Sequence, residues 1–70
     1  MAMYSYGKLR GKLAEIGMSQ EELARKIHLS ATSLNNKMNG KVQFKQNEMM
    51  SILNVICVPV DKVVEYFFAK

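Results

Sequence analysis

The sequence predicts an all-α fold of five short helices, and three observations support that prediction. Gly and Pro are sparse in the 70 residues, and Gly17, Gly40 and Pro59 fall where helices are expected to end or begin. Apolar residues recur three and four positions apart, which is the spacing of a helix that buries one face. Ser19 and Ser30 stand where helices are expected to begin, because Ser is a favoured N-terminal cap.

The first helix is expected over residues 5–16. Leu9, Leu13 and Ile16 fall on one stripe, and Tyr6 extends it. Gly17 then suits the left-handed conformation in which many helices end.

The second and third helices have the clearest start signals. Ser19 and Glu22 match the capping box, in which each side chain accepts a hydrogen bond from the other residue's backbone N–H. An apolar residue before each cap can pack on a second one further along, forming a hydrophobic staple. The staple pairs are Met18 with Leu23 and Leu29 with Leu34. We expect helices over residues 19–28 and 30–39, joined by a tight turn.

The last two helices are recognised mainly by their apolar stripes. The stripe of the fourth helix, which follows a loop over residues 41–45, consists of Met49, Ile52, Leu53 and Ile56. Its start is poorly marked, because Lys45 is not a natural cap. The fifth helix is expected after Pro59, with Asp61 near its positive end. Its stripe consists of Val60, Val63, Val64 and Phe67.

Composition excludes several classes of protein and favours a single domain over residues 1–70. The lone Cys57 cannot form an internal disulfide, and no Cys/His cluster, paired carboxylates or phosphate loop suggests an enzyme. We therefore expect no metal, no cofactor and no small-molecule substrate. The longest apolar run, residues 52–60, is shorter than the roughly 20 residues that cross a bilayer. A cytoplasmic location without membrane contact is the expectation.

Positive charge is concentrated in the middle of the chain. The formal net charge is +4, and no acidic residue lies between Glu22 and Glu48. The cations of this interval are Arg25, Lys26, Lys37, Lys41 and Lys45. A segment of one sign favours a polyanionic partner, although a solvated basic face without a partner fits the charge equally well.

The outer face of the third helix is expected to be small and polar. It consists of Ala31, Thr32, Asn35, Asn36 and Lys37. Asn and Thr are mediocre helix formers, so a function other than helix stability accounts better for them. Asn can contact adenine with two hydrogen bonds, and the methyl groups of Thr and Ala suit thymine. Lys37, Lys41 and Lys45 would then meet phosphates, as would Gln20 and Ser30 at the helix starts.

This segment resembles the helix-turn-helix of the Cro and lambda-repressor-like family. The residues that carry the resemblance are Gln20, Glu22, Leu23, Ala24, Ile27, Leu29, Ser30, Leu34, Asn39, Gly40 and Lys41. Met49, Ile52 and Ile56 match the family's fourth helix, and residues 58–61 resemble the entry to its fifth. The resemblance therefore covers roughly residues 5–68, and residues 30–41 are further similar to small phage and prophage regulators of Gram-positive hosts.

The resemblance implies a compact five-helix lambda-repressor-like DNA-binding domain with a helix-turn-helix core over residues 19–40. Such a protein is a sequence-specific transcriptional regulator, a Cro-like repressor in a bacterial host, which binds operator DNA as a dimer. The recognition helix, residues 31–39, would lie in the major groove. The positions implied to contact bases are Ala31, Thr32, Asn35 and Asn36. Those implied to contact phosphates are Gln20, Ser33, Asn39 and Lys41. The C-terminal residues expected at a homodimer interface are Val64, Tyr66, Phe67 and Phe68, and one of the two adjacent Phe residues should be exposed.

The chain departs from the family at three places. His28 and Cys57 stand where the family usually has Gly, so either the local turn differs or a left-handed residue costs about 1 kcal/mol at each. Lys37-Met38 replaces an apolar residue followed by Glu, which could change where Asn39 points.

An alternative function is that of a phage antirepressor or modulator, which binds another regulator protein instead of DNA. Exposed aromatic residues near the C-terminus and the Met-rich segment would serve that function, whereas the basic interval weighs against it.

Overall fold

The computed structural model describes residues 6–68, which form five α-helices, one 3-10 turn and no strand. The elements are α1 (Gly7–Ile16), α2 (Gln20–Lys26), α3 (Ala31–Met38), α4 (Gln46–Val55), the 3-10 turn η1 (Val60–Lys62) and α5 (Val63–Phe67). The predicted all-α, five-helix architecture is therefore confirmed over these residues. The expected start at Ser5 lies outside the described residues.

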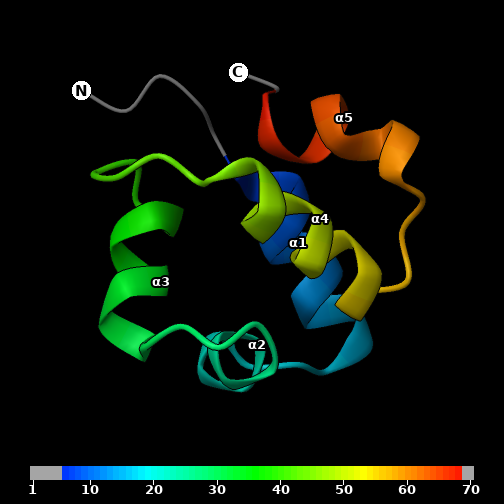
Figure 1. The fold of residues 1–70 in the computed structure, drawn as a ribbon. Helices are drawn as coiled ribbons and strands as arrows, with labels where there is room; N and C mark the ends of the chain where they lie inside the picture. Colours follow the sequence, from blue (N-terminus) through cyan, green and yellow to red (C-terminus); the bar gives the residue numbers. More distant parts are fainter. Residues whose placement is uncertain (1–5, 69–70) are drawn as a thin grey trace.

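The helices surround a small core, with α3 and α5 on opposite sides of the molecule (Figure 1). α2 packs against α3 and α4, and α5 packs against α1 and α4. The core residues come from every helix and from the α3–α4 loop: Tyr6, Leu9, Leu13, Leu23, Ala24, Leu34, Met38, Phe44, Ile52, Leu53, Ile56, Tyr66 and Phe67. The Cα radius of gyration is 10.9 Å, close to the roughly 11 Å of a folded chain of this length.

Two predicted apolar stripes are wrong at their ends. Ile16 is exposed, because α1 ends there and Met18, after the turn at Gly17, packs against the core in its place. Val60 and Val64 are exposed as well. The chain after Pro59 first forms a 3-10 turn, whose period of three residues differs from that of an α-helix and rotates the stripe.

The side-chain caps form as expected at the starts of α2 and α3. Ser19 Oγ accepts the Glu22 N–H at 3.0 Å, and Glu22 Oε1 accepts the Ser19 N–H at 3.1 Å. The hydrogen bonds that the Ser19 backbone N–H and side chain give to the Glu22 carboxylate lower the pKa of Glu22 below its ordinary value. At α3, Ser30 Oγ accepts the Ser33 N–H at 3.1 Å. The start of α4, poorly marked in sequence, is held by Glu48, whose Oε1 accepts the Lys45 N–H at 2.8 Å.

Four helices end in the same way, with one residue of left-handed backbone. These residues are Gly17, His28, Gly40 and Cys57, with φ of 69°, 62°, 77° and 60°. In each case the following N–H bonds to a carbonyl five residues back, as Leu29 does to Ala24 at 2.9 Å and Val58 to Leu53 at 2.9 Å. This is the Schellman ending. His28 and Cys57 therefore take the left-handed conformation that Gly most often takes at a helix end.

Replacing His28 with Gly is expected to raise the free energy of unfolding by up to about 1 kcal/mol. The substitution removes the Cβ clash of a left-handed residue, partly offset by the greater freedom of Gly in the unfolded chain. Urea unfolding followed by circular dichroism measures the change.

Gly17→Ala is the matched control for this prediction. A Cβ at Gly17 would meet nothing within 4 Å, so its expected cost of about 1 kcal/mol reflects the backbone alone. Gly17→Ala is expected to lower stability. If His28→Gly also lowered it, the prediction would fail, because the His28 side chain would then make a stabilising contact that outweighs the backbone strain.

Candidate nucleic-acid interface

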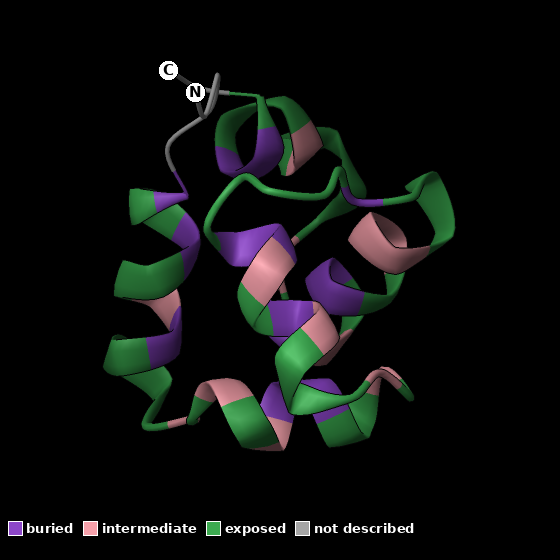
Figure 2. Cartoon of the chain, turned by 90° about the vertical axis from the view of Figure 1, so that its left-hand side faces the viewer, coloured by how far each residue is buried: buried purple, intermediate pink, exposed green. Residues whose placement is uncertain are grey.

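The outer face of α3 carries the residues expected to contact bases. Ala31, Thr32 and Asn35 are exposed and Asn36 is half-buried. The opposite face is buried through Leu34 and Met38. Figure 2 looks onto α3, which lies at the front of the molecule in that view. α3 therefore presents a small polar face without long side chains.

A hydrogen bond joins the start of α2 to the middle of α3. Gln20 Nε2 donates to Asn35 Oδ1 at 3.2 Å. The structure thus brings together one residue expected to contact phosphate and one expected to contact a base. Because the side-chain oxygen of Asn35 accepts a hydrogen bond from Gln20, the Nδ2 group of the same amide remains as a donor.

Lys37 does not lie on the outer face, so its predicted placement there is wrong, and nothing in its surroundings supports a phosphate contact. Its side chain turns toward α4, where Nζ forms an ion pair with Glu48 Oε1 at 2.5 Å. Only 7% of Lys37 is exposed. Burial acts to raise the pKa of Glu48, but the hydrogen bonds from Lys37 and the Lys45 backbone outweigh it, and the net shift is downward. Glu48 ends the basic interval of the sequence, and in the fold it neutralises the charge of Lys37, one of the cations of that interval.

The other residues expected at phosphates remain near the surface. Ser30, Asn39, Lys41 and Lys45 are exposed, and Ser33 is half-buried. The Ser30 hydroxyl is engaged as the cap of α3, which is a structural role with or without a ligand.

The structure adds Arg10, which the sequence did not single out. Arg10 Nη2 donates to the Met38 carbonyl and to Asn39 Oδ1, each at 3.0 Å. These contacts connect α1 to the C-terminal end of α3 across 28 and 29 positions of sequence. No local pattern marks so distant a contact. Asn39 therefore points toward α1, which answers the question raised by the Lys37-Met38 departure.

The ion pairs divide the cations of residues 6–68 into two groups. Lys8 and Lys62 approach Glu65 at 3.3 and 3.9 Å, Lys12 approaches Glu15 at 3.2 Å, and Lys37 is paired with Glu48. The described cations without a carboxylate partner are Arg10, Arg25, Lys26, Lys41 and Lys45. Arg25 and Lys26 lie in the last turn of α2, where the helix dipole favours positive charge. The other three adjoin the end of α3 or the loop after it.

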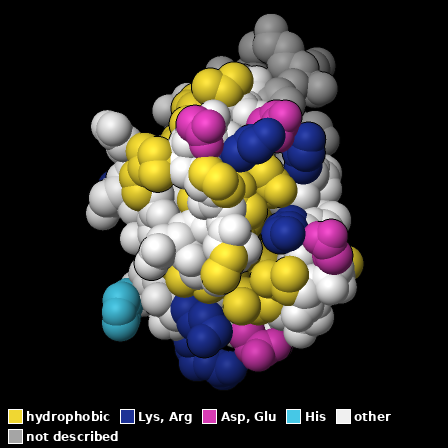
Figure 3. Space-filling model, turned by 90° about the vertical axis from the view of Figure 1, so that its right-hand side faces the viewer, with side chains coloured by type: hydrophobic (Ala, Val, Ile, Leu, Met, Phe, Trp, Pro, Cys, Tyr) yellow, Lys and Arg dark blue, Asp and Glu magenta, His cyan; other side chains and the backbone are white. Residues whose placement is uncertain are grey.

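The C-terminal residues expected at a dimer interface are split by the fold. Tyr66 and Phe67 are buried in the core, with exposures of 9% and 1%, so their side chains are not available on the surface for the expected interface. Val64 and Phe68 are 65% and 41% exposed. The expectation that one of the two adjacent Phe residues is exposed is confirmed. Hydrophobic side chains gather on this face, over α5, between charged ones (Figure 3).

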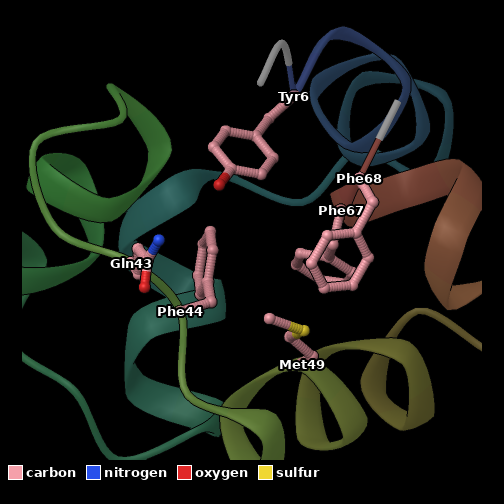
Figure 4. Close-up of a pocket in the computed structure, with 6 residues that line it drawn as sticks. All are labelled: Tyr6, Gln43, Phe44, Met49, Phe67 and Phe68. Carbon is pink, nitrogen blue, oxygen red and sulfur yellow. The ribbon is translucent and has the colours of Figure 1, made fainter. Parts of the chain in front are cut away.

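Phe67 is buried because it packs in a cluster with two other aromatic rings, those of Tyr6 and Phe44. Tyr6, Phe44 and Phe67 meet edge to face, with centroid distances of 5.3 Å for Tyr6–Phe44 and 5.2 Å for Phe44–Phe67. They border a cavity of about 90 Å³, also lined by Gln43, Met49 and Phe68 (Figure 4). A cavity of this size is well below the roughly 300 Å³ of a ligand pocket, so packing is the role that the cluster supports.

Within residues 6–68, no three His, Cys, Asp or Glu side chains are grouped as a metal site would require. No helix in the same part of the chain has the length and hydrophobicity of a membrane span.

The fold and this surface define a small all-α domain that exposes an uncharged polar helix beside unpaired cations. The chain belongs to the family described as "Protein of unknown function (DUF739)", which it matches over residues 1–70. A search of the curated proteins found no match.

Proposed function

We propose that this protein is a sequence-specific DNA-binding regulator of transcription, a Cro-like repressor in which α2 and α3 act as a helix-turn-helix. The observation that carries the proposal is the outer face of α3. Its exposed residues are short and uncharged, Thr32 and Asn35 can hydrogen-bond, and unpaired cations adjoin the end of the helix. Such a helix fits the major groove, where base edges are read.

Base contacts are assigned to Ala31, Thr32, Asn35 and Asn36. The free Nδ2 donor of Asn35, whose oxygen accepts from Gln20, suits acceptors such as purine N7 or thymine O4. Phosphate contacts are assigned to Gln20, Ser30, Ser33, Asn39, Lys41 and Lys45. Lys37 is not among them, because its charge is already paired.

A second copy of the chain is the proposed protein partner. Val64 and Phe68 leave apolar surface exposed beside η1, and such surface in a small domain suits an interface. A two-fold dimer would place its two α3 helices at half-sites about one helical turn apart.

Asn36→Ala and Lys41→Ala are expected to weaken DNA binding in different ways. Asn36→Ala should weaken the binding free energy by about 1–3 kcal/mol on a duplex selected from a random library, with little effect on an unselected duplex.

Lys41→Ala should weaken binding to both duplexes equally. It should also reduce the slope of log affinity against log salt concentration by about 1. Fluorescence anisotropy at several salt concentrations measures both effects, and the stoichiometry of the complex reports whether two copies bind.

The wild-type protein serves as the reference for the class of function. Binding of neither duplex at low salt would remove the DNA-binding proposal and favour the antirepressor alternative, in which the protein binds another regulator. If Asn36→Ala lowered the affinity for both duplexes equally, Asn36 would not read a base, and the assignments of the other residues would be unaffected.

A further inference from the structure

We propose that Arg10 is a positioning residue of the DNA-binding surface, which orients Asn39 so that its amide donor is presented to a phosphate. The inference rests on the proposed function and adds to it a residue from α1. It starts from the two hydrogen bonds that a single nitrogen, Arg10 Nη2, makes at the end of α3.

The chemistry of the three groups fixes the orientation of Asn39. A guanidinium has only donors, so the Asn39 amide must turn its Oδ1 acceptor toward Arg10. The Nδ2 group, which carries two donors, then points away. Phosphate oxygens only accept hydrogen bonds, so this orientation is the one that binds a phosphate and the flipped orientation is the one that repels it.

The position of Arg10 supports a role beyond folding. Its side chain is exposed, and it has no carboxylate partner within the described residues, unlike Lys8 and Lys12 on the same helix. Its second acceptor is the Met38 carbonyl, in the last turn of α3, where the helix dipole is negative. Arg10 is thus held by the end of α3 itself, and Asn39 is held through Arg10.

A double-mutant cycle tests whether Arg10 acts through Asn39. Arg10→Met and Asn39→Ala are each expected to lower the affinity for the selected duplex about tenfold, the size of one hydrogen bond to a charged group. The double variant should lose about tenfold, because removing Arg10 has no further effect once Asn39 is absent. Arg10→Lys should not restore affinity, since an ammonium lacks the planar fork of the guanidinium. Losses that multiply to about a hundredfold, or full recovery with Lys, would overturn the proposal.

Asn39→Asp gives a test that keeps the contact with Arg10. The carboxylate still accepts from Arg10, so thermal stability should not fall, but the donor that faces the phosphate is replaced by a negative oxygen. We expect a loss of affinity at least tenfold beyond that of Asn54→Asp, which adds the same charge at an exposed position of α4. Equal losses in the two variants would show that Asn39 faces no phosphate. If the wild type binds DNA and these tests fail, the role of Arg10 fails while the proposed function stands; if the wild type binds no DNA, both fall.

Discussion

Replacing Lys37 with Met is expected to lower the free energy of unfolding by up to about 3–5 kcal/mol, because it leaves the Glu48 carboxylate, whose side chain is only 11% exposed, without its partner. The whole stability of a domain of this length is about 4–10 kcal/mol. The substitution should therefore remove a large part of the stability and lower the midpoint of thermal unfolding, which circular dichroism would detect.

The double variant Lys37→Met, Glu48→Gln is the control for this prediction. It removes both charges, and the Gln oxygen can still accept the Lys45 N–H, so most of the stability should return. The two proteins should also differ in acid. The pKa of Glu48 is lowered in the folded protein, so its contribution is complete above the ordinary value of 4.5 and is lost as the pH falls through the lowered pKa. The same acid dependence in wild type and double variant would contradict a stabilising ion pair.

Phe44→Ala is expected to cost about 3–5 kcal/mol, the range for removing a fully packed aromatic side chain. The ring lies between Tyr6 and Phe67, so its loss would open a cavity that joins the one already beside it. Urea unfolding measures the change. Val42→Ala, at an exposed position of the same loop, should change stability by less than about 0.5 kcal/mol. Similar effects of the two substitutions would mean that Phe44 does not anchor the loop.

The local features of the fold were predictable from sequence because they depend on neighbours in the chain. The capping box of Ser19 and Glu22 and the ending at Gly17 each involve residues within five positions of one another. The first turn of a helix and its last residue can be recognised from such short patterns. The 3-10 turn before α5 could not, since Pro59 marks a start without fixing the helical period.

The contacts that shape the candidate site join distant residues, and sequence patterns did not reveal them. Lys37 has a helical spacing that places it beside the outer face, but Glu48 lies close enough to draw it inward. Arg10 and Asn39 are 29 positions apart. The residues on the outer face of α3 were therefore predictable. The side chains of α1, α2 and α4 that hold α3 were not, because these contacts depend on how the four helices pack.

Three side-chain contacts hold α3 from three other helices: Asn35 to Gln20 of α2, Lys37 to Glu48 of α4, and Asn39 to Arg10 of α1. A helix of eight residues would by itself be marginal in water, yet this one is fixed near its middle and at its end. Each side chain immobilised on binding costs about 0.5–1.5 kcal/mol of entropy. Because Asn35, Lys37 and Asn39 already have partners in the free protein, these three side chains add little to the conformational entropy that an association through α3 would cost.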